Sequence, residues 1–187
     1  MSRSADKSEF AFREATIEDA PEIARVNYLT WLDAYRGLIP DSELDSLNLE
    51  SLTDRWKQDL DSPNPRSRTF VVVHGDSVIA YSRFYPSVDP DDAQGQVATI
   101  GSMYINPEFW RQGIGRRLMA TVLEAANSHD FTEVTLHVLA SNKRARAFYE
   151  NLGWEVDIDP ELENSIGETV PKARYRMSLQ ESLGIFE

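Results

Sequence analysis

The segment 107–117, which reads Pro-Glu-Phe-Trp-Arg-Gln-Gly-Ile-Gly-Arg-Arg, constrains the fold more than any other part of the chain. An apolar, strand-like run, Ile100–Ile105, precedes it, and apolar residues with helical spacing, such as Leu118 and Val122, follow it. This order predicts a strand, a tight turn and a helix that begins at the glycines. Glycine lets a ligand approach the backbone, and a helix start presents unpaired N–H groups at its positive end. The turn is therefore suited to holding a phosphate.

The spacing of this turn excludes two better-known phosphate-binding motifs. The lysine and hydroxyl of Gly-x-x-x-x-Gly-Lys-Ser/Thr are missing, and so is the third glycine of Gly-x-Gly-x-x-Gly. A single Gly-x-Gly before a helix is often only a packing or capping feature. The interpretation of the turn therefore depends on a second motif downstream.

The second motif occupies residues 131–154. Residues 131–139 alternate in polarity, which predicts a strand. Ser141 or Asn142 is placed to cap a following helix, and Gly153 is placed to end it. Asn142 and Tyr149 are seven positions apart, so the helix would hold both on one face.

Together the two segments resemble motifs A and B of the GCN5-related N-acetyltransferases, the GNAT superfamily. The first resembles the Arg/Gln-x-x-Gly-x-Gly/Ala pyrophosphate loop, and the likeness extends over about residues 10–180. The second resembles the Asn-x-x-Ala-x-x-Phe-Tyr-x-x-x-Gly-Phe block, here Asn142, Ala145, Phe148, Tyr149, Gly153 and Trp154. Two positions depart from the pattern. Trp110 replaces the usual Arg or Gln, and Thr99 or Gly101 replaces a strand carboxylate that often supplies the base.

The resemblance implies an α/β fold with a mixed sheet of about seven strands and helices on both faces. It implies that strands four and five splay apart, with pantetheine lying in the split. The implied activity is transfer of an acetyl group from acetyl-CoA to a primary amine, on a small molecule or a peptide terminus, by direct attack in a ternary complex. No metal is expected, and a homodimer is common in the family.

The resemblance also implies a set of cofactor contacts. These are Met103, Tyr104, Ile105, Arg111, Gln112, Gly113, Ile114, Gly115, Arg116 and Asn142. One backbone N–H of Met103–Ile105 would stabilise the oxyanion, although the same run also fits a plain central strand. The positive charge that Trp110 lacks would come from Arg111, Arg116 and Arg117. The alternative is that these arginines only form a solvated face of the helix. Asn142 fits a helix cap as well as a cofactor contact.

Two side chains are the catalytic candidates. Tyr149 would protonate the departing sulfur as general acid, or it is a buried amphipathic residue beside Phe148. His137 precedes Asn142 on the neighbouring strand and would serve as general base, since histidine titrates at about pH 6.5. The alternatives are a half-buried histidine bonded within the sheet, or proton loss through water.

Five further residues are candidates for the acceptor pocket or, equally, for the core: Trp31, Tyr35, Tyr81, Arg83 and Tyr85. Trp31 and Tyr35 begin a Trp-x-x-x-Tyr-Arg-Gly-x-x-Pro signature typical of a poorly defined GNAT subgroup. The acceptor itself is not predicted by the sequence. A non-catalytic acyl-CoA-binding or sensor module and a nucleotide-binding protein remain alternatives to the enzyme.

Composition limits the remaining choices. With 187 residues and 41% hydrophobic content, the chain fits a single domain, 1–187, whose first nine residues are expected to be flexible. The chain has no cysteine, and its net charge of −12 disfavours nucleic acid as a partner. No apolar leader or membrane span is recognised, so a cytoplasmic location is expected.

Periodicity and turn residues place the other elements. The expected elements are a strand at Phe10–Arg13, a helix from the Thr16–Asp19 capping box to Tyr35, one or two helices in 42–60, a hairpin of Thr69–His74 and Val78–Tyr85, a mobile acidic loop at 86–95, strands at Glu155–Ile158 and Ala173–Leu179, and an acidic loop at 159–169.

Overall fold

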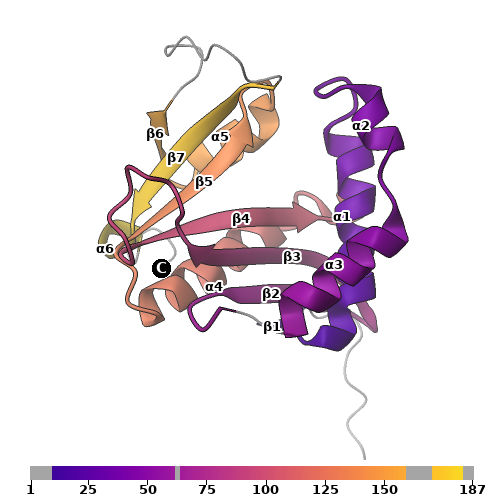
Figure 1. Ribbon diagram of the computed structural model, residues 1–187, viewed down its shortest axis with the longest axis horizontal. Helices are drawn as coiled ribbons and strands as arrows, with labels where there is room; N and C mark the ends of the chain where they lie inside the picture. Colours follow the sequence, from indigo (N-terminus) through magenta and orange to yellow (C-terminus); the bar gives the residue numbers. More distant parts are fainter. Residues whose placement is uncertain (1–9, 62–63, 159–169, 183–187) are drawn as a thin grey trace, which may run out of the picture.

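The computed structural model describes residues 10–61, 64–158 and 170–182 (Figure 1). Its strands are β1 (Phe10–Glu14), β2 (Arg68–His74), β3 (Ser77–Pro86), β4 (Val97–Ile105), β5 (Glu133–Leu139), β6 (Glu155–Ile158) and β7 (Lys172–Ser178). Its helices are α1 (Ala20–Ala34), α2 (Asp41–Asp45), α3 (Leu49–Asp61), α4 (Ile114–Ser128), α5 (Lys143–Glu150) and α6 (Leu179–Ser182), with 3-10 turns η1 (Ile17–Asp19) and η2 (Pro107–Phe109). The expected loop 159–169 and the expected flexible terminus 1–9 lie outside the described residues.

The strands form one mixed sheet in the order β1-β2-β3-β4-β5-β7-β6. Strands β1 to β4 pair antiparallel, and β5 pairs antiparallel with β7 along its whole length. β4 and β5 are parallel and pair only from Val97–Ile100 to Glu133–Leu136. Beyond these residues the two strands diverge (Figure 1), so the predicted splay between strands four and five is confirmed.

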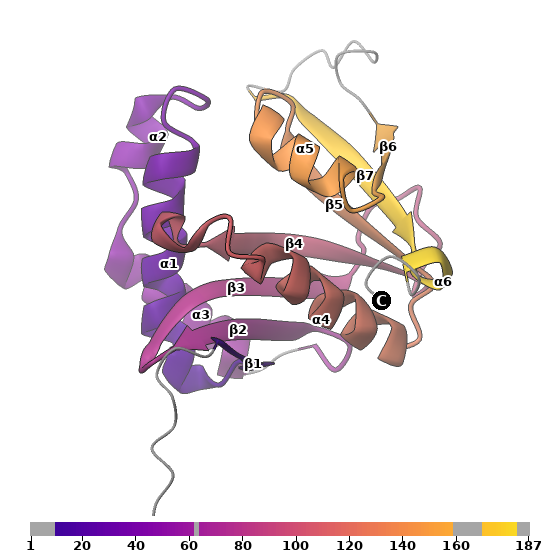
Figure 2. The same ribbon diagram turned by 180° about the vertical axis from the view of Figure 1, so that it is seen from behind.

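Helices cover both faces of this sheet, as predicted. α1 and α3 lie on the face seen in Figure 1, where Ile23 and Val26 pack with Val71 and Tyr81. α4 and α5 lie on the other face (Figure 2). There the apolar side of α4, which includes Leu118, packs on the inward residues of β4 and β5 in the larger core cluster.

Local signals in the sequence mark the element ends correctly. The capping box forms, since the Thr16 amide donates to Asp19 Oδ2 at 2.8 Å and Arg13 holds the same carboxylate. Gly153 ends α5 with a left-handed φ of 81°. Its amide and the next one donate to the carbonyls of Glu150 and Tyr149, the pattern of a Schellman motif.

The acidic loop between β3 and β4 is tied to the sheet by ion pairs. Asp91 pairs with Arg174 of β7, and Asp92 lies 2.6 Å from Arg176 of the same strand. Composition alone predicted a mobile loop, because the partner arginines lie more than 80 residues further along the chain. No helix among the described residues is long and apolar enough to cross a bilayer.

Candidate functional site

A cavity of about 550 Å³ lies where β4 and β5 diverge, and we call it the divergence cavity. The start of α4, the turn before it, α5 and the end of α1 complete its walls. It contains most of the predicted site residues: Met103, Tyr104, Ile105, Arg111, Gly113, Ile114, Gly115, Arg116, His137, Asn142 and Tyr149. The two sequence motifs, distant along the chain, therefore meet in one cavity.

One wall of this cavity is the second half of β4. Its residues pair with β3 on one side, as Met103 does with Ser82 and Tyr104 with Tyr81. On the other side β5 has diverged, so the main chain of residues 101–105 is left without a strand partner there. The carbonyl of Ile105 already accepts hydrogen bonds, from Trp110 Nε1 at 2.8 Å and from the Thr30 hydroxyl at 3.4 Å.

The turn before α4 contains two residues with a left-handed backbone conformation, Arg111 (φ 62°) and Gly113 (φ 76°). No side chain caps the helix at Gly113, and the first intrahelical bond reaches from the Arg117 amide. The preceding amides of the first turn thus have no partner within the helix, which suits an anionic ligand. Gly115 serves packing, since a Cβ there would press on Ile105 and Phe148 at 3.1 Å.

Positive charge reaches the cavity from two elements. Arg111 and Arg116 come from the turn and α4, and Arg144 comes from α5, where its guanidinium stacks 3.7 Å above the Trp110 ring. Trp110, which replaces the usual Arg or Gln, thus holds the guanidinium of Arg144 over its ring. Arg117 lies over the Phe12 ring at 4.3 Å and does not line the cavity, so its expected contribution of charge stays a prediction.

Gln112 is the one predicted cofactor residue outside the cavity lining. Its side chain is exposed, and its amide lies 3.4 Å from the carbonyl of Glu108. The side chain bends back over the 3-10 turn because the left-handed residues on either side reverse the backbone. Any contact between Gln112 and a ligand would therefore come from its main chain.

Asn142 is the N-cap of α5, as one of its two interpretations predicted. Its side-chain oxygen accepts the amide of Ala145 at 3.1 Å, and the residue is buried in the cavity wall. The cap uses the oxygen of the side chain. The NH₂ group of the same amide is chemically able to serve a ligand, so the two interpretations are compatible.

Tyr149 lies two turns further along α5 and lines the same cavity. Its ring packs against Phe148, Trp154 and Tyr175 at centroid distances of 5.3, 6.1 and 6.2 Å. Burial raises the pKa of its hydroxyl well above the usual range, and the nearby phenol of Tyr104 adds to the shift. The hydroxyl therefore stays protonated at neutral pH and is a hydrogen-bond donor.

His137 and Gly101 connect the divergence cavity with two others. The aromatic cavity, about 580 Å³, is lined by Trp31 and Tyr35 among others, and the basic cavity, about 430 Å³, by Arg174 and Tyr85 among others. His137 and Gly101 line all three. Gly101 is required here because a Cβ would overlap the Tyr85 ring.

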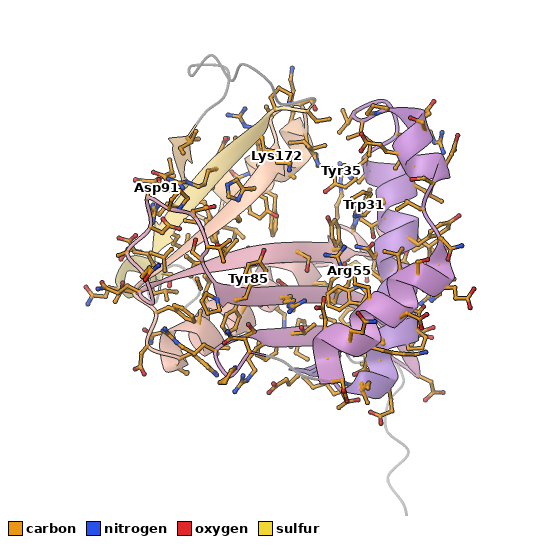
Figure 3. The ribbon with its side chains drawn as sticks, viewed as in Figure 1. Trp31, Tyr35, Arg55, Tyr85, Asp91 and Lys172 are labelled. Carbon is orange, nitrogen blue, oxygen red and sulfur yellow. The ribbon has the colours of Figure 1, made fainter. Side chains whose placement is uncertain are left out.

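The side chain of His137 is 38% exposed and faces an acidic residue. Its Nε2 lies 3.8 Å from Asp89 Oδ2, and Arg174 approaches the same carboxylate at 3.4 Å. The histidine is not part of the core packed under α4, and it lines a cavity together with Trp31 and Lys172, which are labelled on the face shown in Figure 3. This position allows it to contact a molecule that enters from that face.

The five acceptor candidates separate into two groups. Trp31 and Tyr35 line the aromatic cavity, and Tyr85 lines the basic one. Tyr81 is fully buried and accepts a hydrogen bond from Asn27 at 2.6 Å, so it belongs to the core. Arg83 lines none of the three cavities, and it pairs with Asp59 at 2.5 Å.

Sequence reasoning missed Lys172, which lines both the aromatic and the basic cavity, and Glu43, which lines the aromatic one. A signal was present for the lysine, because Lys172, Arg174 and Arg176 alternate along the last strand and so share one face. Within the described residues, no group of three or more His, Asp or Glu side chains is placed to hold a metal ion.

Comparison with known proteins agrees with this geometry. The model of the "Acetyltransferase (GNAT) family" matches residues 28–154. The uncharacterized N-acetyltransferase YuaI of Bacillus subtilis is 32% identical over 133 residues, 70% of this chain and 72% of its own.

Solved structures share the fold. The PaiA N-acetyltransferase of Thermoplasma acidophilum, in complex with coenzyme A, matches with a TM-score of 0.70 and 16% identity over 91% of this chain and 99% of its own. yncA of Salmonella typhimurium, with its cofactor acetyl-CoA, matches with a TM-score of 0.68 and 15% identity over 92% of this chain and 95% of its own.

Proposed function

The chain belongs to the acetyltransferase (GNAT) family, and from this premise we propose that it transfers the acetyl group of acetyl-CoA to a primary amine by direct attack in a ternary complex. The observation that carries the proposal is the divergence cavity. It gathers the residues of both motifs and meets the two cavities of the other face at Gly101 and His137. A thioester on one side and an amine on the other would meet between the diverging strands.

The residues present fit acetyl-CoA as a co-substrate. The uncapped first turn of α4, with Arg111 and Arg116, would hold the pyrophosphate, and Arg144 would add charge from α5. The unpaired edge of β4 at Met103–Ile105 would bind the pantetheine amides as an added strand does. One N–H of that edge would stabilise the oxyanion, a contribution of about 10²–10³ in rate.

Chemically, the amine nitrogen forms a bond to the acetyl carbon as the carbon–sulfur bond breaks. The amine gives up one proton and the sulfur takes one, so the products are an amide and free coenzyme A. His137 would accept the amine proton, because it lies where the cavities join.

Tyr149 would act on the departing sulfur. Because burial raises the pKa of its hydroxyl further above that of an ordinary thiol, complete transfer of its proton to the thiolate is unfavourable. Hydrogen-bond donation to the sulfur is then the larger part of its effect, and bulk water supplies the final proton. The chain contains no cysteine, which is consistent with direct attack rather than an enzyme thioester.

The test is release of free coenzyme A from acetyl-CoA across a panel of polyamines, aminoglycosides, amino acids and short peptides. We expect amine-dependent release that falls by about 10²–10⁴ in Tyr149→Phe, while acetyl-CoA binding is retained. Tyr28→Phe on α1, outside the divergence cavity, is the matched control and should leave turnover unchanged.

Two results would contradict this proposal. If acetyl-CoA binds but no amine accelerates thiol release, a binding module is favoured over the enzyme. If Tyr149→Phe turns over at the full rate, Tyr149 has no part in the mechanism.

A further inference from the structure

Three basic residues of β7 lie on one face of the sheet, and two of them are neutralised. Arg176 pairs with Asp92, Glu133 and Asp157. Arg174 pairs with three aspartates: Asp89, Asp91 and Asp157. Lys172, the third in the row, forms no ion pair with any residue that the structure describes.

Lys172 lines the same two cavities as the proposed base, His137. It stands opposite Leu139 of β5, two pairs further along than the His137–Arg174 pair, so Lys172 and His137 share a face. Both line the aromatic cavity and the basic cavity. A cation without an ion-pair partner among the described residues therefore lines the same cavities as the proposed base.

The opposite wall of the aromatic cavity carries a negative charge. Glu43 of α2 lines it, together with Trp31 and Tyr35 of α1. Figure 3 shows Trp31 and Tyr35 on one side of the opening and Lys172 on the other. The cavity thus has a cationic wall at Lys172 and an anionic wall on which the aromatic rings also lie, an arrangement complementary to a molecule that carries both charges.

Trp31 contributes its ring to the same cavity. Its indole Nε1 is shielded from water and interacts with the hydroxyl of Tyr104, so the ring rather than the N–H is available to a ligand. The ring itself is fixed edge-to-face on Tyr35 at 5.2 Å.

We propose that the acceptor is a free amino acid, whose carboxylate binds Lys172 while its amine faces His137. The proposal rests on the acetyltransferase function proposed above, and its product is an N-acetyl amino acid with free coenzyme A. A cation beside the amine lowers the pKa of its ammonium form, which favours the neutral nucleophile. A cavity of about 580 Å³ has room for one small molecule.

A purely cationic acceptor fits this site less well. The net charge of −12 would attract a polyamine to the protein at long range. Inside the aromatic cavity, however, Lys172 would repel a second ammonium group. The positive charge of Lys172 in the cavity therefore opposes the binding of a polyamine, although the net negative charge of the protein favours it.

The experiment compares the standard amino acids with their decarboxylated counterparts and with spermidine, by coenzyme A release. Four proteins are compared: wild type, Lys172→Met, Trp31→Phe and Lys57→Met. Lys57 pairs with Asp54 on the exposed side of α3, so Lys57→Met changes the net charge equally without touching the cavities. Acetyl-CoA binding and thermal unfolding are measured for each variant.

We expect at least one amino acid to exceed its decarboxylated counterpart by about tenfold or more in kcat/KM. Lys172→Met should abolish most of this preference through KM and leave kcat and the decarboxylated amine nearly unchanged. Trp31→Phe keeps an aromatic ring in the cavity wall and should change this preference little, and Lys57→Met should not change it.

Amine-dependent release that favours decarboxylated amines or spermidine, and that is indifferent to Lys172→Met, would overturn the inference and leave the proposed function standing. No release with any acceptor, despite acetyl-CoA binding, would overturn the proposed function and this inference with it.

Discussion

His137 lies where the divergence cavity, the aromatic cavity and the basic cavity meet. It follows Leu136, the last residue of β5 that pairs with β4, so β4 no longer runs beside it. Gly101 on the other strand has no side chain to close the space, and the Tyr85 ring takes that place instead. The contact between the proposed co-substrate and acceptor sites thus depends on these two positions.

The first prediction concerns the base. His137→Gln should lower kcat/KM at neutral pH by about 10²–10⁴ and remove the fall in rate on the acidic side of the pH–rate profile. The reason is that glutamine cannot titrate there. Steady-state rates from pH 5 to pH 9 measure this, with His74→Gln as control because His74 packs between Phe10 and Phe109, outside the three cavities. An unchanged profile would assign proton removal to water.

At the scale of elements, α5 carries both a residue that caps the helix and the residue proposed to act on the sulfur. Its N-cap, Asn142, sets where the helix begins, and Tyr149 follows two turns later on the same side. The Schellman motif at Gly153 fixes the other end. Because both ends are fixed, the direction in which the Tyr149 ring points is fixed as well.

The two roles of Asn142 can be separated by two substitutions. Asn142→Ala should lower the free energy of unfolding by about 1 kcal/mol through loss of the cap, and it should also weaken acetyl-CoA binding. Asn142→Ser keeps a capping oxygen, so its stability should stay close to wild type while binding is still weakened. Denaturant unfolding and calorimetric titration measure the two effects. Wild-type affinity in Asn142→Ser would leave Asn142 as a cap alone.

At the scale of the whole molecule, charge is unevenly arranged. The loop between β3 and β4 places its aspartates on the arginines of β7, across the line where the sheet divides (Figure 3). These ion pairs connect the two parts of the sheet on the side of the proposed acceptor site. Among the described residues, Lys172 is the basic residue of its strand that takes no part in this network.

The network predicts a pH dependence of stability. Hydrogen bonding to Arg174 lowers the pKa of Asp91 from 3.8 to about 2. A carboxylate with a depressed folded-state pKa stabilises the protein above its unfolded value and loses that effect as pH falls through the folded value. Asp91→Asn should therefore lower Tm at pH 7, and the gap to wild type should shrink below about pH 4 and vanish near pH 2.

The control for this measurement is Asp33→Asn, an exposed change of the same charge on α1. It should give no comparable gap at any pH. A gap for Asp91→Asn that persists unchanged at pH 2, or that is absent at pH 7, would show that the ion pair does not stabilise the loop.

Much of the local structure follows from the sequence because it depends on neighbours along the chain. The capping box at Thr16, the cap at Asn142 and the turn at Gly113 each use bonds that reach no more than four residues. The glycine turn and the Asn142–Tyr149 spacing were enough to indicate the family and its sheet. Periodicity also assigned the buried faces of β5 and α4 correctly.

Only the tertiary structure decided which side chains face the site. Arg117 and Arg144 are equally basic in the sequence, but the direction of α4 turns Arg117 onto Phe12 while α5 brings Arg144 over Trp110. Lys172 and Trp31 are far apart in the chain and line one cavity because β4 and β5 diverge. The divergence depends on packing across the whole sheet, and no local hydrogen bond or periodicity encodes it.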